Sequence, residues 1–362
     1  MRKLLLTLVS LFATVLDVSA QSVVYQDASA FPVYGKAYKD DGGSGPHFRR
    51  LPESLHGVVR DPVWGLGCNS AGLYVRFRSN APRIDVHWTN NGNHMSHMAD
   101  CGTGGLDLYV WQDGRWQFAG SAFDNGTDHT RTIVSGMEPQ MREFMLYLSL
   151  YDEVKTLELG VPEDYVLEQP QMRSPDDRKP IVMYGTSILQ GGCTSRPGTA
   201  FTNILSRRFN RTVINLGFSG NALLDEEIAR LMAEVEDPAV FVLDYVPNST
   251  PERTRERGEK FFRILRDSHP GVPVIFVENP LFTHVTVDRN AAKWVEDNNA
   301  EQKALYQRLK KAGEKRIYYV SAKGMIGDDG EAAVDGVHFT DLGMFRYADH
   351  ITPALKRALK DR

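Results

Sequence analysis

A serine, an aspartate and a histidine stand at positions in this 362-residue chain where they could perform acyl transfer. Ser187 follows the apolar run Ile181–Tyr184 and Gly185, a pattern typical of a buried strand that ends in a sharp turn. Asp335 and His338 lie three residues apart near the carboxyl end, so the carboxylate could orient the imidazole. We predict Ser187 as the nucleophile, His338 as its base and Asp335 as the residue that orients the base.

Each of these residues also has an ordinary structural interpretation. Ser187 and Asp335 could cap turns, and His338 could be a structural histidine near the start of a helix. The catalytic interpretation is favoured because side chains at the carboxyl ends of strands in an open α/β sheet meet in the crevice where ligands bind.

Apolar strands alternate with amphipathic helices in the second half of the chain, which predicts a parallel sheet covered on both faces. The strands after the first are expected at 212–216, 240–244, 273–278 and 317–320, and the helices at 198–209, 226–235, 251–267, 290–312 and 341–359.

Short alternating strands and turns, with no convincing helix, fill the first half and predict a jelly-roll-like β-sandwich. The segment 168–179 is polar and contains proline, so we expect it to link a sandwich domain at 21–167 to an α/β domain at 180–362. The expected sandwich strands are 73–78, 84–88, 106–111, 115–119, 144–148 and 155–159.

Four blocks follow one another in the second half: Gly185–Ile188, Asn215–Asn221, Asp244–Asn248 and Asp335–His338. In type and order they resemble the blocks of the SGNH, or GDSL-like, hydrolases over about residues 178–360. Thr186 and Ile188 replace the Asp and Leu of the family name, which weakens assignment to the lipase-like branch. The run Ser70–Ala81 is similar to a β-rich domain that accompanies some of these hydrolases in bacterial glycan-degrading enzymes.

The resemblance implies a flavodoxin-like, three-layer α/β/α domain with Ser187 on its first strand. It also implies an oxyanion hole made by the backbone N–H groups of Ser187 and Gly220 and the side-chain amide of Asn248. Taken alone, glycines after a strand and a Pro-Asn pair are common turn residues. For Arg196, binding of a substrate carboxylate and a solvated loop position are equally open. The residues predicted to contact the substrate are Arg196, Asn221 and Tyr245.

One polar loop carries several potential metal ligands, namely His94, His97, Asp100 and Cys101. Their spacing matches no standard metal site, so we predict no metal and no cofactor. We expect instead that this loop lies over the catalytic crevice and shapes the substrate site.

The three cysteines allow at most one internal disulfide, and Cys68 and Cys101 could form it. Cys193 lies close to Ser187 in sequence but has no motif of its own, so we expect it to serve packing.

Residues 1–20 have the features of an export signal: Arg2 and Lys3, an apolar run, and small residues up to Ala20. A membrane anchor is the alternative, but the apolar run is too short to span a bilayer comfortably. We expect cleavage after Ala20 and a periplasmic or secreted protein without membrane insertion after signal removal.

The composition is that of a soluble globular enzyme, with 42% hydrophobic and 24% charged residues and a net charge of −4. Such a balance offers no basic stripe for nucleic acid. We predict a serine esterase that removes small acyl groups, acetyl above all, from an acylated glycan or other small ester. This prediction rests on the expected export, the expected sandwich domain and the presence of Thr186. The alternatives are a lipase or arylesterase of the same fold, and a glycan-binding protein without turnover.

Overall fold

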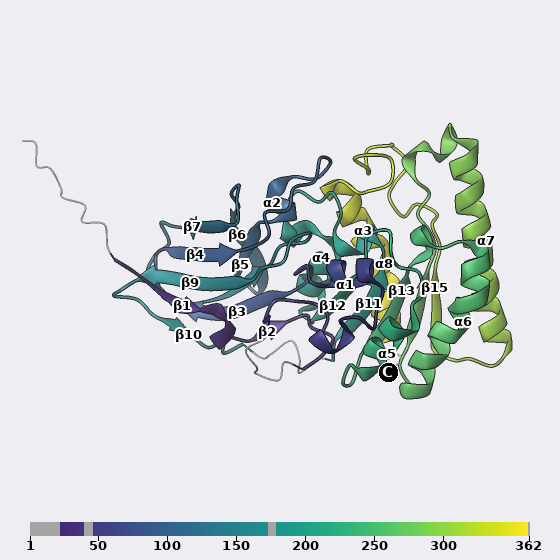
Figure 1. Ribbon diagram of the computed structural model, residues 1–362, viewed down its shortest axis with the longest axis horizontal. Coiled ribbons are helices and arrows are strands. Elements are labelled where there is room, and N and C mark those ends of the chain that lie inside the picture. Colours follow the sequence, from purple (N-terminus) through teal and green to yellow (C-terminus); the bar gives the residue numbers. More distant parts are fainter. Residues whose placement is uncertain (1–21, 40–45, 173–178, 361–362) are drawn as a thin grey trace, which may run out of the picture.

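The computed structural model describes residues 22–39, 46–172 and 179–360, which form two sheet-containing halves side by side along the long axis (Figure 1). The expected export signal and part of the expected linker lie outside the described residues.

Two antiparallel sheets form the first half, in the orders β1-β9-β4-β7 and β10-β3-β8-β5-β6, with β2 beside β3. An apolar core that includes Phe77, Trp88 and Leu146 fills the space between the two sheets, as expected for a sandwich. Part of the segment expected to be a linker is strand, since β10 includes Glu168. The strands are β1 Val23–Asp27, β2 Val33–Tyr34, β3 Tyr74–Ser79, β4 Ile84–Thr89, β5 Leu106–Gln112, β6 Arg115–Ala122, β7 Asp128–Val134, β8 Arg142–Tyr147, β9 Thr156–Pro162 and β10 Leu167–Glu168.

The first half also contains two short helices, α1 (Asp61–Gly67) and α2 (Asp100–Thr103), so the prediction of no helix there is wrong. Glycines break up the apolar pattern of α1, which hides it in the sequence. Tertiary contact stabilises α1 instead, because Val63 is fully buried in the core of the second half.

A five-stranded parallel sheet in the order β12-β11-β13-β14-β15 forms the centre of the second half. This order confirms the flavodoxin-like arrangement, with the first strand, β11, between β12 and β13. Because parallel strands end at the same edge, the loops after these three strands are neighbours. The strands are β11 Ile181–Gly185, β12 Val213–Gly217, β13 Val240–Asp244, β14 Val274–Val277 and β15 Ile317–Val320.

Helices cover both faces of this sheet (Figure 1). Alternate residues of β11 point to opposite faces: Val182 and Tyr184 pack with α5 and α6, whereas Ile181 and Met183 pack with α4 and α8. The helices are α3 Ser187–Gln190, α4 Phe201–Phe209, α5 Glu226–Glu234, α6 Pro251–Ser268, α7 Arg289–Lys311 and α8 Asp341–Lys360, with 3-10 turns η1 Ala28–Ala30, η2 Glu53–Leu55, η4 Pro197–Thr199, η5 Val246–Asn248 and η6 Thr283–Thr286.

Asp244, the last residue of β13, is a carboxyl group buried beneath the sheet edge. Burial raises its pKa to about 8 from an ordinary 3.8, and the Tyr347 hydroxyl donates to its Oδ1 at 2.8 Å. Its Oδ2 has no hydrogen-bond partner within the described ranges. Burial therefore favours the protonated form of Asp244 at neutral pH.

We predict that Asp244 makes the free energy of unfolding depend on pH. Its pKa is higher in the folded than in the unfolded chain, so its contribution is fully present below about pH 4 and is lost as the pH rises through about 8. Asp244→Asn, which stays neutral, should flatten this fall in denaturant titrations, whereas the exposed control Asp267→Asn should keep it. Parallel curves for Asp244→Asn and the unmodified protein would contradict the prediction.

Candidate active site

Ser187 begins α3, separated from the end of β11 by one residue, and side chains from both halves of the protein hold the backbone there. Thr186 caps the helix, because its Oγ1 accepts a hydrogen bond from the Ile188 amide at 3.3 Å. The Tyr151 hydroxyl, from the first half, donates to the Ser187 carbonyl oxygen at 3.2 Å. Ser187 is buried, with 6% of its surface exposed.

The structure brings the three predicted catalytic side chains together. Ser187 Oγ and His338 Nε2 are 2.8 Å apart, and His338 Nδ1 lies 2.7 Å from Asp335 Oδ2. This is the serine–base–carboxylate order that activates a hydroxyl for attack on an ester.

The turn that carries Asp335 keeps its carboxylate ionised. Burial alone would raise the pKa of Asp335, but the bond from the His338 ring and those from the His338 and Val337 amides outweigh burial and lower it to about 2. The carboxylate is therefore available to stabilise a protonated His338.

His284 supports the same turn, although no sequence motif assigns it a role. Gly336 has φ 88°, and a Cβ there would come within 2.7 Å of His284 Nδ1, so glycine is required for both reasons. His284 Nδ1 is also 3.1 Å from the Gly336 carbonyl oxygen, so it can donate a bond that fixes the turn.

Two of the three proposed oxyanion donors, Gly220 and Asn248, lie on the loops that follow the two strands flanking β11. Gly220, with φ 67°, follows β12, and Asn248 ends η5 after β13. The Ala222 amide donates to Asn248 Oδ1 at 3.3 Å, which joins the two loops. Gln190 also holds the first loop, because its Oε1 accepts from the Ser219 amide at 3.1 Å.

Arginines from the first half stabilise the block that contains Gly220. Arg50 is 1% exposed and donates to the carbonyl oxygens of Asn215 at 3.2 Å and Gly217 at 2.6 Å. Arg60 donates to Asn221 Oδ1 at 2.9 Å and to its carbonyl oxygen at 3.0 Å. The side chain of Asn221, which is predicted to contact substrate, therefore accepts a hydrogen bond from Arg60 within the protein.

Arg196 also forms internal contacts, an ion pair with Asp107 and a hydrogen bond to Tyr109. Its Nη1 lies 2.6 Å from Asp107 Oδ2 and donates to the Tyr109 hydroxyl at 2.8 Å. The same Asp107 oxygen accepts from the Gly198 amide at 2.7 Å. Arg196 therefore does not occupy a solvated loop position, because it joins the two halves of the protein.

Tyr245 is fully buried, and its hydroxyl donates to Gln302 Oε1 at 2.6 Å. The prediction that it contacts substrate is wrong, because the side chain points into the core between the sheet and α7.

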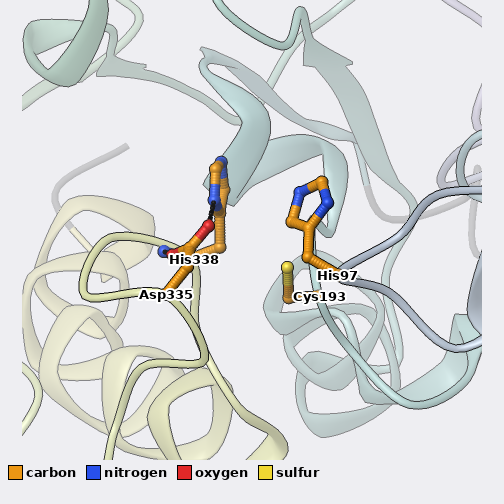
Figure 2. Close-up of side chains that lie close together, drawn as sticks. All are labelled: His97, Cys193, Asp335 and His338. Carbon is orange, nitrogen blue, oxygen red and sulfur yellow. Dashed lines mark hydrogen bonds and ion pairs between the residues drawn. The ribbon is translucent and has the colours of Figure 1, made fainter.

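The loop with the histidines does reach the catalytic residues, as expected. The rings of His97 and His338 have centroids 5.5 Å apart, and Figure 2 shows His97 and Cys193 facing His338 and Asp335. His94 instead pairs with Asp100 at 2.6 Å, so the four potential ligands named from sequence do not gather.

All three cysteines are free, so the suggested Cys68–Cys101 disulfide is wrong. Cys101 donates to the Ser195 carbonyl oxygen. Burial, aided by the charge of Asp335, raises the pKa of the Cys193 thiol to about 12, which disfavours the nucleophilic thiolate at neutral pH.

Known proteins share this architecture and sequence pattern. Residues 178–356 match the GDSL-like Lipase/Acylhydrolase family, and residues 23–167 match the N-terminus of SGNH-hydrolase-type esterases, a family called GxDLY. The solved structure of a protein described as a GDSL-like lipase, from Bacteroides ovatus, is 34% identical, covering 94% of this chain and 98% of that one with a TM-score of 0.88. No curated protein matches the chain.

Two more distant structures share the fold alone. The salicylyl-acyltransferase SsfX3 from a tetracycline biosynthetic pathway is 16% identical, covers 94% of this chain and 98% of its own, and gives a TM-score of 0.72. A family two carbohydrate esterase from Cellvibrio japonicus is 12% identical, with coverages of 94% and 99% and a TM-score of 0.61.

The fold and the matches define an SGNH-type esterase with an amino-terminal sandwich. The chain belongs to the GDSL-like lipase/acylhydrolase family. The GxDLY motif is present as Gly105–Tyr109 and supplies the Asp107 and Tyr109 that hold Arg196. Among the described helices, none is both long and apolar enough to cross a membrane.

We predict that Arg50 is needed for stability as well as for the shape of the site. Arg50→Ala would leave buried carbonyl oxygens of Asn215 and Gly217 unpaired, so the free energy of unfolding should fall by about 3 kcal/mol or more. Arg230→Ala, which removes an exposed helix pair with Glu226, should cost less than about 1 kcal/mol. Denaturant titration would measure both, and equal losses would refute the assignment.

Proposed function

We propose that the protein is a serine esterase that removes small acyl groups, acetyl in particular, from a carbohydrate or polysaccharide outside the cytoplasm. The main support for ester hydrolysis is the hydrogen-bonded series Ser187–His338–Asp335. Family membership supports the same class of reaction.

In the proposed mechanism, Ser187 attacks the ester carbonyl carbon as His338 takes the hydroxyl proton. The resulting oxyanion is stabilised by the Ser187 and Gly220 N–H groups and the Asn248 amide. His338 then protonates the leaving alkoxide, and water attacks the acyl-enzyme with His338 again as the base. Asp335 remains ionised throughout and stabilises the imidazolium.

Close packing of the chain at Gly192, beside the nucleophile, supports a small acyl group. A Cβ at Gly192 would lie 3.0 Å from the Tyr151 hydroxyl, 3.1 Å from the Ser187 carbonyl oxygen and 3.2 Å from His338 Cδ2. The wall beside Ser187 is therefore close-packed. A hydroxylated leaving group is favoured by the polar side chain of His97 at the opening, which could exchange hydrogen bonds with a sugar.

The second candidate function is that of a lipase or arylesterase, and one observation supports it. Val334, beside Asp335, and Leu342 and Phe345 of α8 are exposed at 49%, 45% and 45%. Apolar side chains near the catalytic turn would favour an apolar ester.

Ser187→Ala should lower kcat by about three to six powers of ten while the protein remains folded, since the attacking oxygen is lost. Ser268→Ala changes an exposed serine at the end of α6 and should retain near-normal turnover. Circular dichroism would establish folding, and a serine-reactive phosphonate should label only protein that keeps Ser187. Near-normal turnover of Ser187→Ala would end the serine-esterase proposal, and a folded, unlabelled protein would favour glycan binding.

Substrate class can be separated by comparing initial rates on acetylated xylan, acetylated pectin, aryl acetates and long-chain aryl esters. We expect the highest kcat/KM on an acetylated polysaccharide, and kcat/KM should fall steeply as the acyl chain of the aryl ester lengthens. Faster hydrolysis of long-chain esters would favour the lipase candidate. Finding the mature protein, cleaved after residue 20, in the periplasm or medium would test the proposed export.

A further inference from the structure

Four potential metal ligands from three separate segments meet beside the nucleophile. His97 comes from the loop before α2, Cys193 from the turn after α3, and Asp335 and His338 from the turn before α8. Each offers one ligand atom, and these atoms all lie within 4.8 Å of one another. Figure 2 shows the Asp335–His338 pair facing His97 and Cys193 across an interval between the two groups.

We propose that this cluster binds a zinc-like divalent cation that switches the esterase off. Imidazole nitrogen, cysteine sulfur and carboxylate oxygen are the three ligand types that Zn²⁺ uses in proteins. Sulfur and imidazole also favour Zn²⁺ over Mg²⁺ or Ca²⁺, which prefer oxygen. The negative charge of Asp335 adds an electrostatic attraction for a cation.

Such a site requires a modest rearrangement: the most distant ligand atoms must approach one another, and a cation held by both Asp335 and His338 Nδ1 must replace their 2.7 Å hydrogen bond. Zn–N bonds of about 2.0–2.1 Å and Zn–S bonds of about 2.3 Å place tetrahedral ligand atoms roughly 3.4–3.6 Å apart. The ligand atoms lie within 4.8 Å of one another, so the two most distant atoms would have to move closer together by about 1 Å. His97 can supply it, because its side chain is exposed on a loop, whereas Cys193 is 7% exposed and closely packed.

The backbone at Cys193 is a second observation that sets this residue apart. Its φ is 67°, in the left-handed region where residues other than glycine are uncommon. A side chain at this position costs conformational energy that glycine would avoid, and such outliers gather at functional sites. The strained turn holds Sγ toward His97 and the catalytic pair.

Metal binding would disable the base through either nitrogen of His338. A cation on Nε2 takes the lone pair that accepts the Ser187 proton, and a cation on Nδ1 replaces the bond to Asp335. Cys193 would bind as the thiolate and release its proton to solvent. The inhibitory effect rests on the proposed esterase function, whereas the binding of metal does not.

The inhibition test measures residual esterase activity of the full chain against free Zn²⁺, each variant being normalised to its own metal-free rate. The unmodified protein should be inhibited and should recover with a chelator. His97→Ala and Cys193→Ser should each need at least about tenfold more Zn²⁺ for half-inhibition. His94→Ala and Cys68→Ser, at residues outside the cluster, should behave like the unmodified protein. Equal inhibition of all five proteins would overturn the proposal.

A binding test separates this proposal from the proposed function. Co²⁺ added to Ser187→Ala should give the thiolate-to-cobalt absorption band and the intense visible bands of a tetrahedral ion, and Cys193→Ser should remove the thiolate band. If the thiolate-to-cobalt band appears but the unmodified protein has no esterase activity, the esterase function is refuted and the metal site stands. Absence of the band in folded protein would refute the metal site, whatever the activity.

Discussion

The buried carboxylate of Asp107 is the interaction on which the arrangement around the nucleophile depends. Asp107 lies on a sandwich strand, is fully buried, and binds Arg196 and the Gly198 amide in the loop that follows Ser187. A buried charge is costly unless it is paired and hydrogen-bonded, so the two halves must meet in one register for Asp107 to be satisfied. The nucleophile's loop is thereby fixed by a residue about eighty positions away in sequence.

A buried charge from the first half, that of Arg50, also fixes the strand end that leads into the loop with Gly220. Burial lowers the pKa of Arg50 to about 10, so its guanidinium remains charged at neutral pH and must find acceptors in the interior. It finds them in the carbonyl oxygens at the end of β12. Together with Tyr151 and His97, these contacts mean that the sandwich supplies part of the active site's framework.

Ser187, Asp335 and His338 could be proposed as a catalytic group from the sequence because each follows a local pattern: an apolar strand before a turn, or an Asp-x-x-His spacing. Their hydrogen-bonded arrangement agrees with that proposal. The parallel sheet was likewise predictable from local patterns. The internal contacts of Tyr245 and Arg196 are not predictable from local pattern, because their partners, Gln302 and Asp107, are distant in sequence. The helix α1 was missed because packing against the other half, and not its own periodicity, stabilises it.

The close approach at Gly72 has a consequence for how such proteins diversify. A Cβ at this position would lie 2.5 Å from the Asn215 side chain, so the sandwich touches β12 with no room to spare. A first half taken from a homologue would have to reproduce Gly72 and also the contacts that Arg50 and Asp107 make with the second half. The two halves are therefore expected to be inherited as a single recombination unit, unlike binding modules tethered by a flexible tail.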